Sequence, residues 1–238
     1  AAVVVVLGPF RIETLTVPFA GTEISLGLWS YPITVIWIVA ISNALNFIDG
    51  VDGLAGGTAA IAALFFAIIA FLLGHGIAAA LAVGLLGALL GFLVFNLPQA
   101  KVFMGDSGSY VLGFMLGVLP LAIPEGGRGS MALLPVITIL LVPIVDMTTS
   151  VFRRLRRGKH PFSADREHLH HKLMDVGMGS WNILAVIYVT NVVLGGAGLL
   201  WYLATPALAT PVQLTLWLAT ALAVSALTRA QRRAAGTE

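Results

Sequence analysis

The chain has 238 residues, of which 58% are hydrophobic and only 10% are charged, and its mean hydropathy is +0.97. An average soluble domain is roughly 25% charged, so this composition excludes a soluble globule, and it excludes intrinsic disorder, which needs high charge and low hydrophobicity. The chain has no cysteine, so it has neither disulfides nor thiolate metal sites. Its net charge of +2 gives no indication of a nucleic-acid partner. The class that remains is a polytopic membrane protein.

Hydrophobic runs that are long enough to cross a bilayer recur along the chain. Residues 1–7 resemble the end of such a helix, and they have neither Met nor a basic segment ahead of them, so we expect an N-terminally truncated chain. The complete candidate spans are 29–48, 54–73, 77–95, 110–123, 131–152, 183–203 and 212–227, of which 110–123 is short. We expect an all-α polytopic membrane protein with about seven full transmembrane helices and one partial helix, forming a single integral membrane domain over residues 1–238.

The basic residues predict which side of the membrane each loop occupies. If the chain changes sides at every span, Arg11 and Arg128 lie on one side and the other 11 of the 13 basic residues lie on the opposite side. The positive-inside rule makes that second side cytoplasmic. Cytoplasmic loops are therefore expected at 49–53, 96–109 and 153–182, and the alternating segment 11–26 is expected to form a short extracytoplasmic β-hairpin.

The first polar cluster lies at the end of the span 29–48. Asn43, Asn46, Asp49 and Asp52 recur at every third residue, and on a helix such residues are neighbours along one ridge. Gly50 allows the backbone to turn sharply there. A helix end with a capping turn is one interpretation. We favour a functional site, because ionisable groups in membrane spans usually serve function.

The second cluster lies in the loop before the span 110–123. It contains Lys101, Phe103 and Asp106. One interpretation is that Asp106 is a helix N-cap. The other is that it binds a hard cation, beside a helix N-terminus that can itself face a phosphate group.

The third cluster lies in the loop 153–182. Its basic run 153–157 is explained by topology and anionic-lipid contact, but this does not explain Arg166, His168, His170 and His171. Arginine offers paired donors to phosphate oxygens, and histidine donates to phosphate or moves a proton near neutral pH. Zinc binding stays open as an alternative, although no H-E-x-x-H motif accompanies these histidines.

Asp146, inside the span 131–152, is either a structural partner of the basic run or part of the site. Taken together, the clusters place aspartates, arginines and histidines on one membrane surface. Carboxylates suit Mg²⁺, and Mg²⁺ with Arg and His suits a diphosphate. The sequence therefore predicts phosphoryl transfer at the lipid interface.

The stretches NALNFIDGVDGLAGG, KVFMGDSGS, PIVDMTTSVFRR and PFSADREHLHHKL resemble the polyprenyl-phosphate N-acetylhexosamine-1-phosphate transferases, of the glycosyltransferase family 4 type. The resemblance implies that a UDP-activated N-acetylhexosamine donates its sugar 1-phosphate to undecaprenyl phosphate and that UMP is released. It also implies a multi-pass enzyme of the bacterial cytoplasmic (inner) membrane with its active site facing the cytoplasm. The His-Leu-His-His form resembles the UDP-GlcNAc branch, which begins O-antigen, enterobacterial common antigen or teichoic acid linkage units. The phospho-MurNAc-pentapeptide transferase branch, whose loop carries three consecutive histidines, is the alternative.

The same resemblance assigns roles to residues of all three clusters. It implies a Mg²⁺ cofactor, or Mn²⁺ in its place, bound by Asp106 and Asp49. The catalytic residues that it implies are Asp49, Asp52, Asp106 and His168. The substrate-binding residues that it implies are Asn43, Asn46, Gly50, Lys101, Phe103, Arg166, His170 and His171, with Phe103 stacking on uracil. The family's adjacent aspartate pair, which lies upstream, has no counterpart in this chain.

An ion-coupled transporter is the alternative from a different functional class. It would need polar groups near the membrane midplane and on both sides, whereas only Asp146 lies well inside a span. The expected partners are the UDP-sugar, undecaprenyl phosphate and the lipid bilayer, with no nucleic acid. The sequence does not decide between a monomer and a homodimer.

Overall fold

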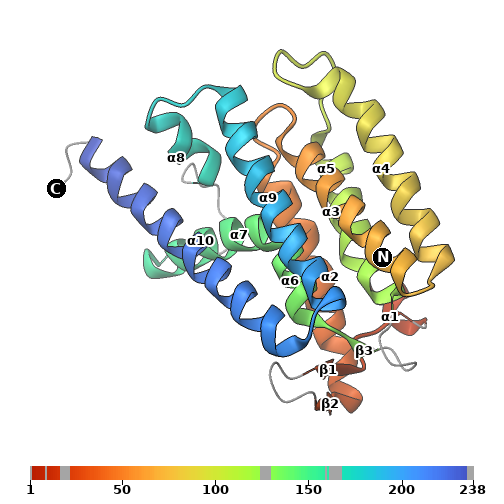
Figure 1. The fold of residues 1–238 in the computed structure, drawn as a ribbon. Helices are drawn as coiled ribbons and strands as arrows, with labels where there is room; N and C mark the ends of the chain where they lie inside the picture. The colour runs from red at the N-terminus through yellow and green to blue at the C-terminus, as the bar shows by residue number, and fades with distance from the viewer. Residues whose placement is uncertain are drawn as a thin grey trace.

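Long helices lying side by side form most of the molecule (Figure 1). The computed structural model describes residues 2–8, 10–16, 22–123, 130–158, 160 and 168–234. Its α-helices are α1 (Ala2–Leu7), α2 (Ser30–Ile48), α3 (Leu54–Leu72), α4 (Gly76–Asn96), α5 (Gly105–Val118), α6 (Leu133–Ile139), α7 (Leu141–Arg156), α8 (Leu169–Asp175), α9 (Ser180–Leu203) and α10 (Pro206–Ala234). Short 3₁₀ turns η1 (Gly27–Trp29) and η2 (Leu119–Ala122) precede α2 and follow α5.

Five helical segments of the described chain are long and apolar enough to cross a membrane. They are Gly27–Ile48, Leu54–Leu72, Gly76–Asn96, Ser180–Leu203 and Ala207–Gln231, and each coincides with a span expected from the sequence. The chain is therefore a multi-pass α-helical membrane protein. The expected count of about seven full spans is not reached in the described residues, partly because α5 has only 14 residues and a crossing needs about 20.

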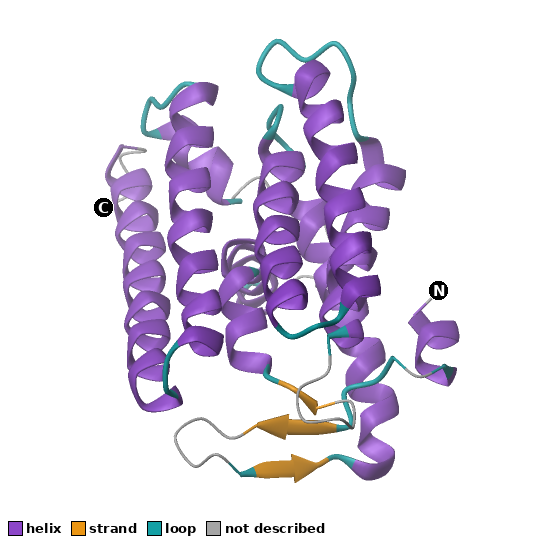
Figure 2. Cartoon of the chain, turned by 45° about the vertical axis from the view of Figure 1, so that its right-hand side comes forward, coloured by secondary structure: helices purple, strands orange, loops and turns teal. Residues whose placement is uncertain are grey.

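Two helices, rather than one, occupy the expected span 131–152. Helices α6 and α7 are bent by 84° to each other at Leu140. Pro143 gives the physical reason: it has no N–H, and within a continuous helix its ring would clash with the carbonyl of Ile139. Proline is tolerated in a first turn, so α7 begins anew at Leu141. As a result α7 runs across the bundle and is seen nearly end-on in Figure 2.

The predicted hairpin over 11–26 is confirmed. Strand β1 (Thr14–Thr16) pairs antiparallel with β2 (Glu23–Ser25), with Leu15 opposite Ile24. A two-residue strand, β3 (Ser130–Met131), adds parallel to β1, which gives the order β2-β1-β3. This sheet lies at the opposite end of the bundle from the loop 97–104 (Figures 1 and 2).

Helices α2 and α5 run antiparallel and touch backbone to backbone. A Cβ atom on Gly113 would lie only 2.5 Å from Ser42 Cα, so only glycine fits there. About one turn further along α5, Gly117 accepts a hydrogen bond at its carbonyl from Trp37 Nε1 at 2.9 Å. Small residues of this kind allow helices to approach closely in lipid. The contact fixes the register that brings the end of α2 beside the start of α5.

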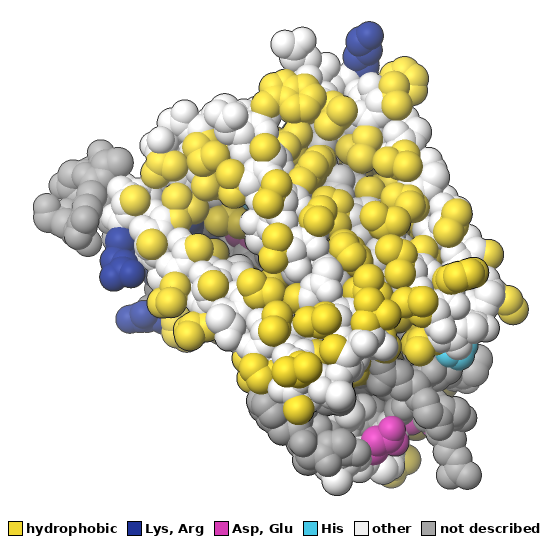
Figure 3. Space-filling view, viewed as in Figure 1, with side chains coloured by type: hydrophobic (Ala, Val, Ile, Leu, Met, Phe, Trp, Pro, Cys, Tyr) yellow, Lys and Arg dark blue, Asp and Glu magenta, His cyan; other side chains and the backbone are white. Residues whose placement is uncertain are grey.

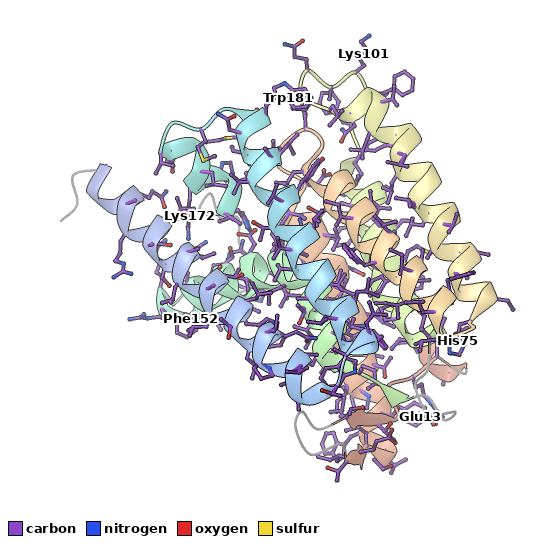
Figure 4. The ribbon with its side chains drawn as sticks, in the orientation of Figure 1. Glu13, His75, Lys101, Phe152, Lys172 and Trp181 are labelled. Atoms are coloured by element: carbon purple, nitrogen blue, oxygen red, sulfur yellow. The ribbon has the colours of Figure 1, made fainter. Side chains whose placement is uncertain are left out.

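The outer surface suits a lipid environment. Figure 3 shows a face dominated by hydrophobic side chains, with Lys and Arg at its upper and left margins and acidic side chains at its lower edge. The labelled Lys101 and Glu13 lie at these two opposite ends (Figure 4). Lys101 thus lies at the end of the bundle away from the sheet, whereas Glu13 lies beside the sheet and pairs with Arg11.

Candidate active site

The C-terminal end of α2 meets the N-terminal end of α5. Asn46 Nδ2 donates to Asp106 Oδ1 at 3.2 Å and to Ser109 Oγ at 3.0 Å. Asp106 lies in the first turn of α5, where the helix dipole stabilises a negative charge. The register set by Gly113 and Ser42 brings these side chains together, so the first and second sequence clusters share one site.

The turn after α2 is tied to the loop after α4. Asp52 Oδ2 accepts from the backbone N–H of Ala100 at 3.2 Å. Asn96 Oδ1 accepts from the N–H of Gly53 at 3.0 Å, and its Nδ2 donates to the carbonyl of Val102 at 2.8 Å. Asn96 is buried, and it belongs to none of the three polar clusters found in the sequence. Its one sequence signal is an amide at the end of an otherwise apolar span.

Helix α9 supports the same turn from another direction. Tyr188 Oη donates to the carbonyl of Gly53 at 2.6 Å. A Cβ atom on Gly57 would collide with the Tyr188 ring, so the tyrosine reaches the turn only because residue 57 is glycine. The sequence alone does not reveal the role of Tyr188, because the residue lies in an apolar run with nothing local to mark it.

The carboxylates of the site are close enough to perturb one another. Partial burial, followed by the negative charges of Asp106 and Asp52, raises the pKa of Asp49 to about 6. No three His, Asp or Glu side chains among the described residues are grouped as a metal site. However, Mg²⁺ is usually held by one or two carboxylates together with substrate phosphates. Oxygen donors whose charges repel one another fit such a hard cation.

Asp146 holds the start of the histidine-bearing helix α8. Its Oδ1 accepts from the backbone N–H of Leu169 at 2.6 Å, and its Oδ2 lies 2.9 Å from His168 Nδ1. Both Asp146 and His168 are buried. Of the two roles that the sequence left open for Asp146, its described contacts favour the one within the site.

The three histidines pack against the end of α2. The His168 ring lies 5.3 Å from Phe47 and is stacked parallel to His170 at 5.9 Å, and His171 lies 4.2 Å from His170. A Cβ atom on Gly50 would collide with the His170 ring. Burial, with a further contribution from His171, lowers the pKa of His170 to about 4, so this ring is neutral near pH 7. The third sequence cluster therefore meets the first at Gly50.

Two other predicted site residues are exposed. Lys101 is exposed at the end of the molecule (Figure 4), and Phe103 is 73% exposed. Asn43 Nδ2 donates to the carbonyl of Val39 on its own helix. Arg166 lies outside the described residues.

Comparison with known proteins identifies the family. The model of glycosyl transferase family 4 matches residues 1–123. The chain belongs to this family. The resemblance drawn from the sequence motifs is thereby confirmed.

Curated relatives from distant bacteria are similar over most of the chain. A probable undecaprenyl-phosphate N-acetylglucosaminyl 1-phosphate transferase of Bacillus subtilis (strain 168) is 39% identical over 79% of this chain and 52% of its own length. An undecaprenyl-phosphate alpha-N-acetylglucosaminyl 1-phosphate transferase of Escherichia coli (strain K12) is 32% identical over 83% of this chain and 55% of its own. A decaprenyl-phosphate N-acetylglucosaminephosphotransferase of Mycolicibacterium smegmatis is 36% identical over 79% of this chain and 52% of its own length. The chain thus spans about half the length of these relatives.

Proposed function

We propose that this chain transfers N-acetylglucosamine 1-phosphate from UDP-GlcNAc to a polyprenyl phosphate, with undecaprenyl phosphate as the favoured acceptor. UMP is the other product, and the reaction is the first membrane step of a cell-envelope polysaccharide. The printed names of the three relatives support this choice, because each contains N-acetylglucosamine and a polyprenyl phosphate. The same names favour this reaction over transfer of phospho-MurNAc-pentapeptide.

One observation carries the proposal: two clusters from distant parts of the chain meet at the end of α2. Asn46 contacts Asp106 on one side, and His170 packs on Gly50 on the other. A nucleotide sugar needs oxygen ligands for a cation and also donors for its phosphates. The end of α2 offers both within a few residues.

The acidic side of this arrangement suits the cation. Asp49 and Asp106 would hold Mg²⁺, or Mn²⁺ in its place, with Asn46 orienting the Asp106 carboxylate. When bound, the cation would offset the charge on the diphosphate during transfer.

The basic side of the arrangement suits the sugar diphosphate. His168 and His171, together with Arg166, would donate to its phosphate oxygens. Neutral His170 packs the histidine cluster against α2.

The acceptor supplies its own nucleophile. A phosphate oxygen of the lipid attacks the sugar-linked phosphorus, one P–O bond forms, and the P–O bond to UMP breaks as UMP departs. The second pKa of a phosphate monoester is about 6, so the attacking oxygen is largely ionised at neutral pH. Positioning by the protein therefore matters more than a strong general base.

Apolar grooves on both sides of α7 suit the polyprenyl chain. A cavity of about 450 Å³ lies between α7, α9 and α10 and reaches α8 at Leu169 and Leu173. A second groove of about 350 Å³ lies between α2 and α7 and reaches Phe47. Both reach residues that contact or adjoin the histidines, so a lipid tail in either would bring its phosphate close to them.

We further propose that the site faces the cytoplasm at the inner membrane. Lys101 marks the end of the bundle where the loops 49–53 and 97–104 lie (Figures 1 and 4). The excess of basic residues expected on that side agrees with the positive-inside rule.

The test uses full-length protein in detergent with undecaprenyl phosphate, Mg²⁺ and UDP-GlcNAc labelled in the sugar. We expect labelled lipid and an equal amount of UMP, loss of both with EDTA, and recovery when Mg²⁺ is added back. UDP-MurNAc-pentapeptide should give no product.

Asp106→Asn should reduce turnover by about 100-fold or more, since it removes a charge beside the phosphates. Glu13→Gln, the same change of acid to amide at the far end of the molecule, serves as the control. Absence of labelled lipid from the wild-type protein would refute the assignment, and full activity of Asp106→Asn would refute the metal role.

A further inference from the structure

The histidine-bearing helix α8 is too short to be stable alone. It has seven residues, whereas isolated helices below about 12–15 residues are marginal in water. Its position must therefore come from contacts with other elements. Asp146 of α7 supplies one anchor at the N-terminal end, through Leu169 and His168.

Helix α10 supplies the anchor at the other end of α8. Lys172 is 2% exposed, and its Nζ donates to Thr228 Oγ1 at 2.8 Å. The Thr228 hydroxyl proton is directed to the carbonyl of Val224 at 2.8 Å, which leaves an oxygen lone pair for the ammonium group. Figure 4 shows Lys172 between α8 and α10.

A second contact lies at the C-terminal end of α8. Gln231 Nε2 donates to Asp175 Oδ2 at 2.6 Å. Gln231 lies three residues after Thr228, on the same face of α10. Two neighbouring side chains of α10 thus hold two side chains of α8.

Helix α10 is itself fixed in the bundle by buried polar contacts. Gln213 is fully buried, and its Nε2 donates to the carbonyl of Ala197 in α9 at 3.1 Å. Trp217 Nε1 donates to Thr138 Oγ1 of α6 at 2.9 Å. Polar contacts between membrane helices restrict how the helices slide against one another. Helix α10 is therefore itself held in place by α6 and α9, and it can in turn fix the position of α8.

We propose that Thr228 and Lys172 are positioning residues for the histidines of α8. Through this pair, α10 holds α8 so that His168 and His170 stay packed against the end of α2. The burial of Lys172 and its bond to Thr228 argue against a direct role for this lysine in binding phosphate. The effect on catalysis rests on the proposed function, whereas the effect on the mobility of α8 does not.

The test compares Thr228→Val with the wild-type full-length protein by hydrogen–deuterium exchange and by kinetics. We expect amides 168–175 to exchange about tenfold faster, because a hydrogen bond to a charged group is lost. We expect kcat to fall by about 5- to 10-fold. Thr228→Ser keeps the hydroxyl and should restore both values.

Ser225→Ala is the control, because Ser225 also lies on α10, its hydroxyl donates to the carbonyl of Ala221, and it does not line the apolar cavity. Neither exchange in α8 nor kcat should change in this variant. Lys172→Met combined with Thr228→Val should cost less than the sum of the two single changes, since each single change removes the same hydrogen bond.

Unchanged exchange of 168–175 in Thr228→Val would overturn the anchoring role. Faster exchange with wild-type kcat would overturn the positioning role. If the wild-type protein made no labelled lipid, the proposed function would fail, and the exchange data would still decide whether α10 anchors α8.

Discussion

Asp146 carries a carboxylate in a buried position where an unpaired charge would be costly. It is 3% exposed, and both of its oxygens have partners, Leu169 N–H and His168 Nδ1. Buried charges are retained in proteins when they are hydrogen-bonded in this way. The contact to Nδ1 also leaves Nε2 as the nitrogen of His168 that is available for other contacts. The carboxylate therefore sets both the ring orientation and the tautomer.

Asp146→Asn should reduce kcat by about tenfold or more, because the amide keeps the shape but loses the charge that orders His168. Steady-state kinetics would measure the effect. Glu13→Gln, which loses its pairing with Arg11 at the sheet end, should stay within about twofold of wild type. An unaltered kcat in Asp146→Asn would contradict this role.

Because His170 is buried as a neutral ring, we expect the protein to lose stability in acid. Its pKa is lowered to about 4 in the folded protein, mainly by burial, whereas an unfolded chain has the ordinary value near 6.5. Above pH 6.5 the His170 ring is neutral in both the folded and the unfolded state, so it does not change the free energy of unfolding with pH. Between pH 6.5 and 4 only the unfolded state takes up the proton, and the free energy of unfolding falls by about 1.4 kcal/mol per pH unit.

The measurement is thermal melting of the detergent-solubilised protein from pH 7.5 to 4, compared with His170→Gln. Other groups titrate in the same range, so the difference between the two proteins is the quantity that reports on His170. The melting temperature of the wild-type protein should fall more steeply below pH 6.5. Parallel curves for the two proteins would be inconsistent with a buried neutral His170.

At the scale of helices, the contact between α2 and α5 decides whether Asn46 reaches Asp106. In Gly113→Ala the added methyl group would press on Ser42 Cα, which is backbone and cannot rotate away. We expect a loss of about 1–3 kcal/mol in the free energy of unfolding, and lower activity as α2 and α5 separate. Gly87→Ala in α4 is the control, since a Cβ atom there meets nothing within 4 Å. Equal melting temperatures for the two variants would show that the α2–α5 contact is not tight.

Helices could be predicted from the sequence where the length and apolarity of a single segment were enough to identify them. Length and apolarity placed the spans that became α3 and α4 to within a residue or so at each end. The break between α6 and α7 was missed because hydropathy does not change across it, and only Pro143 indicates that the helix restarts. Strand β3 was missed because two residues carry no alternating pattern.

At the scale of the molecule, the sequence predicted that three polar clusters share one surface, and the described parts of all three lie close together. Which side chains touch could not be predicted, because Asn46 and Asp106 are 60 residues apart and their contact depends on helix packing. Asn96 and Tyr188 support the same turn and were missed for a related reason. Each is one polar side chain in an apolar run, and its role exists only in the folded chain.

The uneven distribution of basic residues between the loops predicts the orientation of the protein in the membrane. The chain has no cysteine, so one introduced cysteine reports on one position. Lys101 and Glu23 are both exposed and belong to the site end and the sheet end respectively. In intact spheroplasts, a membrane-impermeant maleimide should label Glu23→Cys but should label Lys101→Cys only after permeabilisation, because basic loops are retained in the cytoplasm. Labelling of Lys101→Cys from outside would place the site on the opposite face, where UDP-sugars made in the cytoplasm could not reach it.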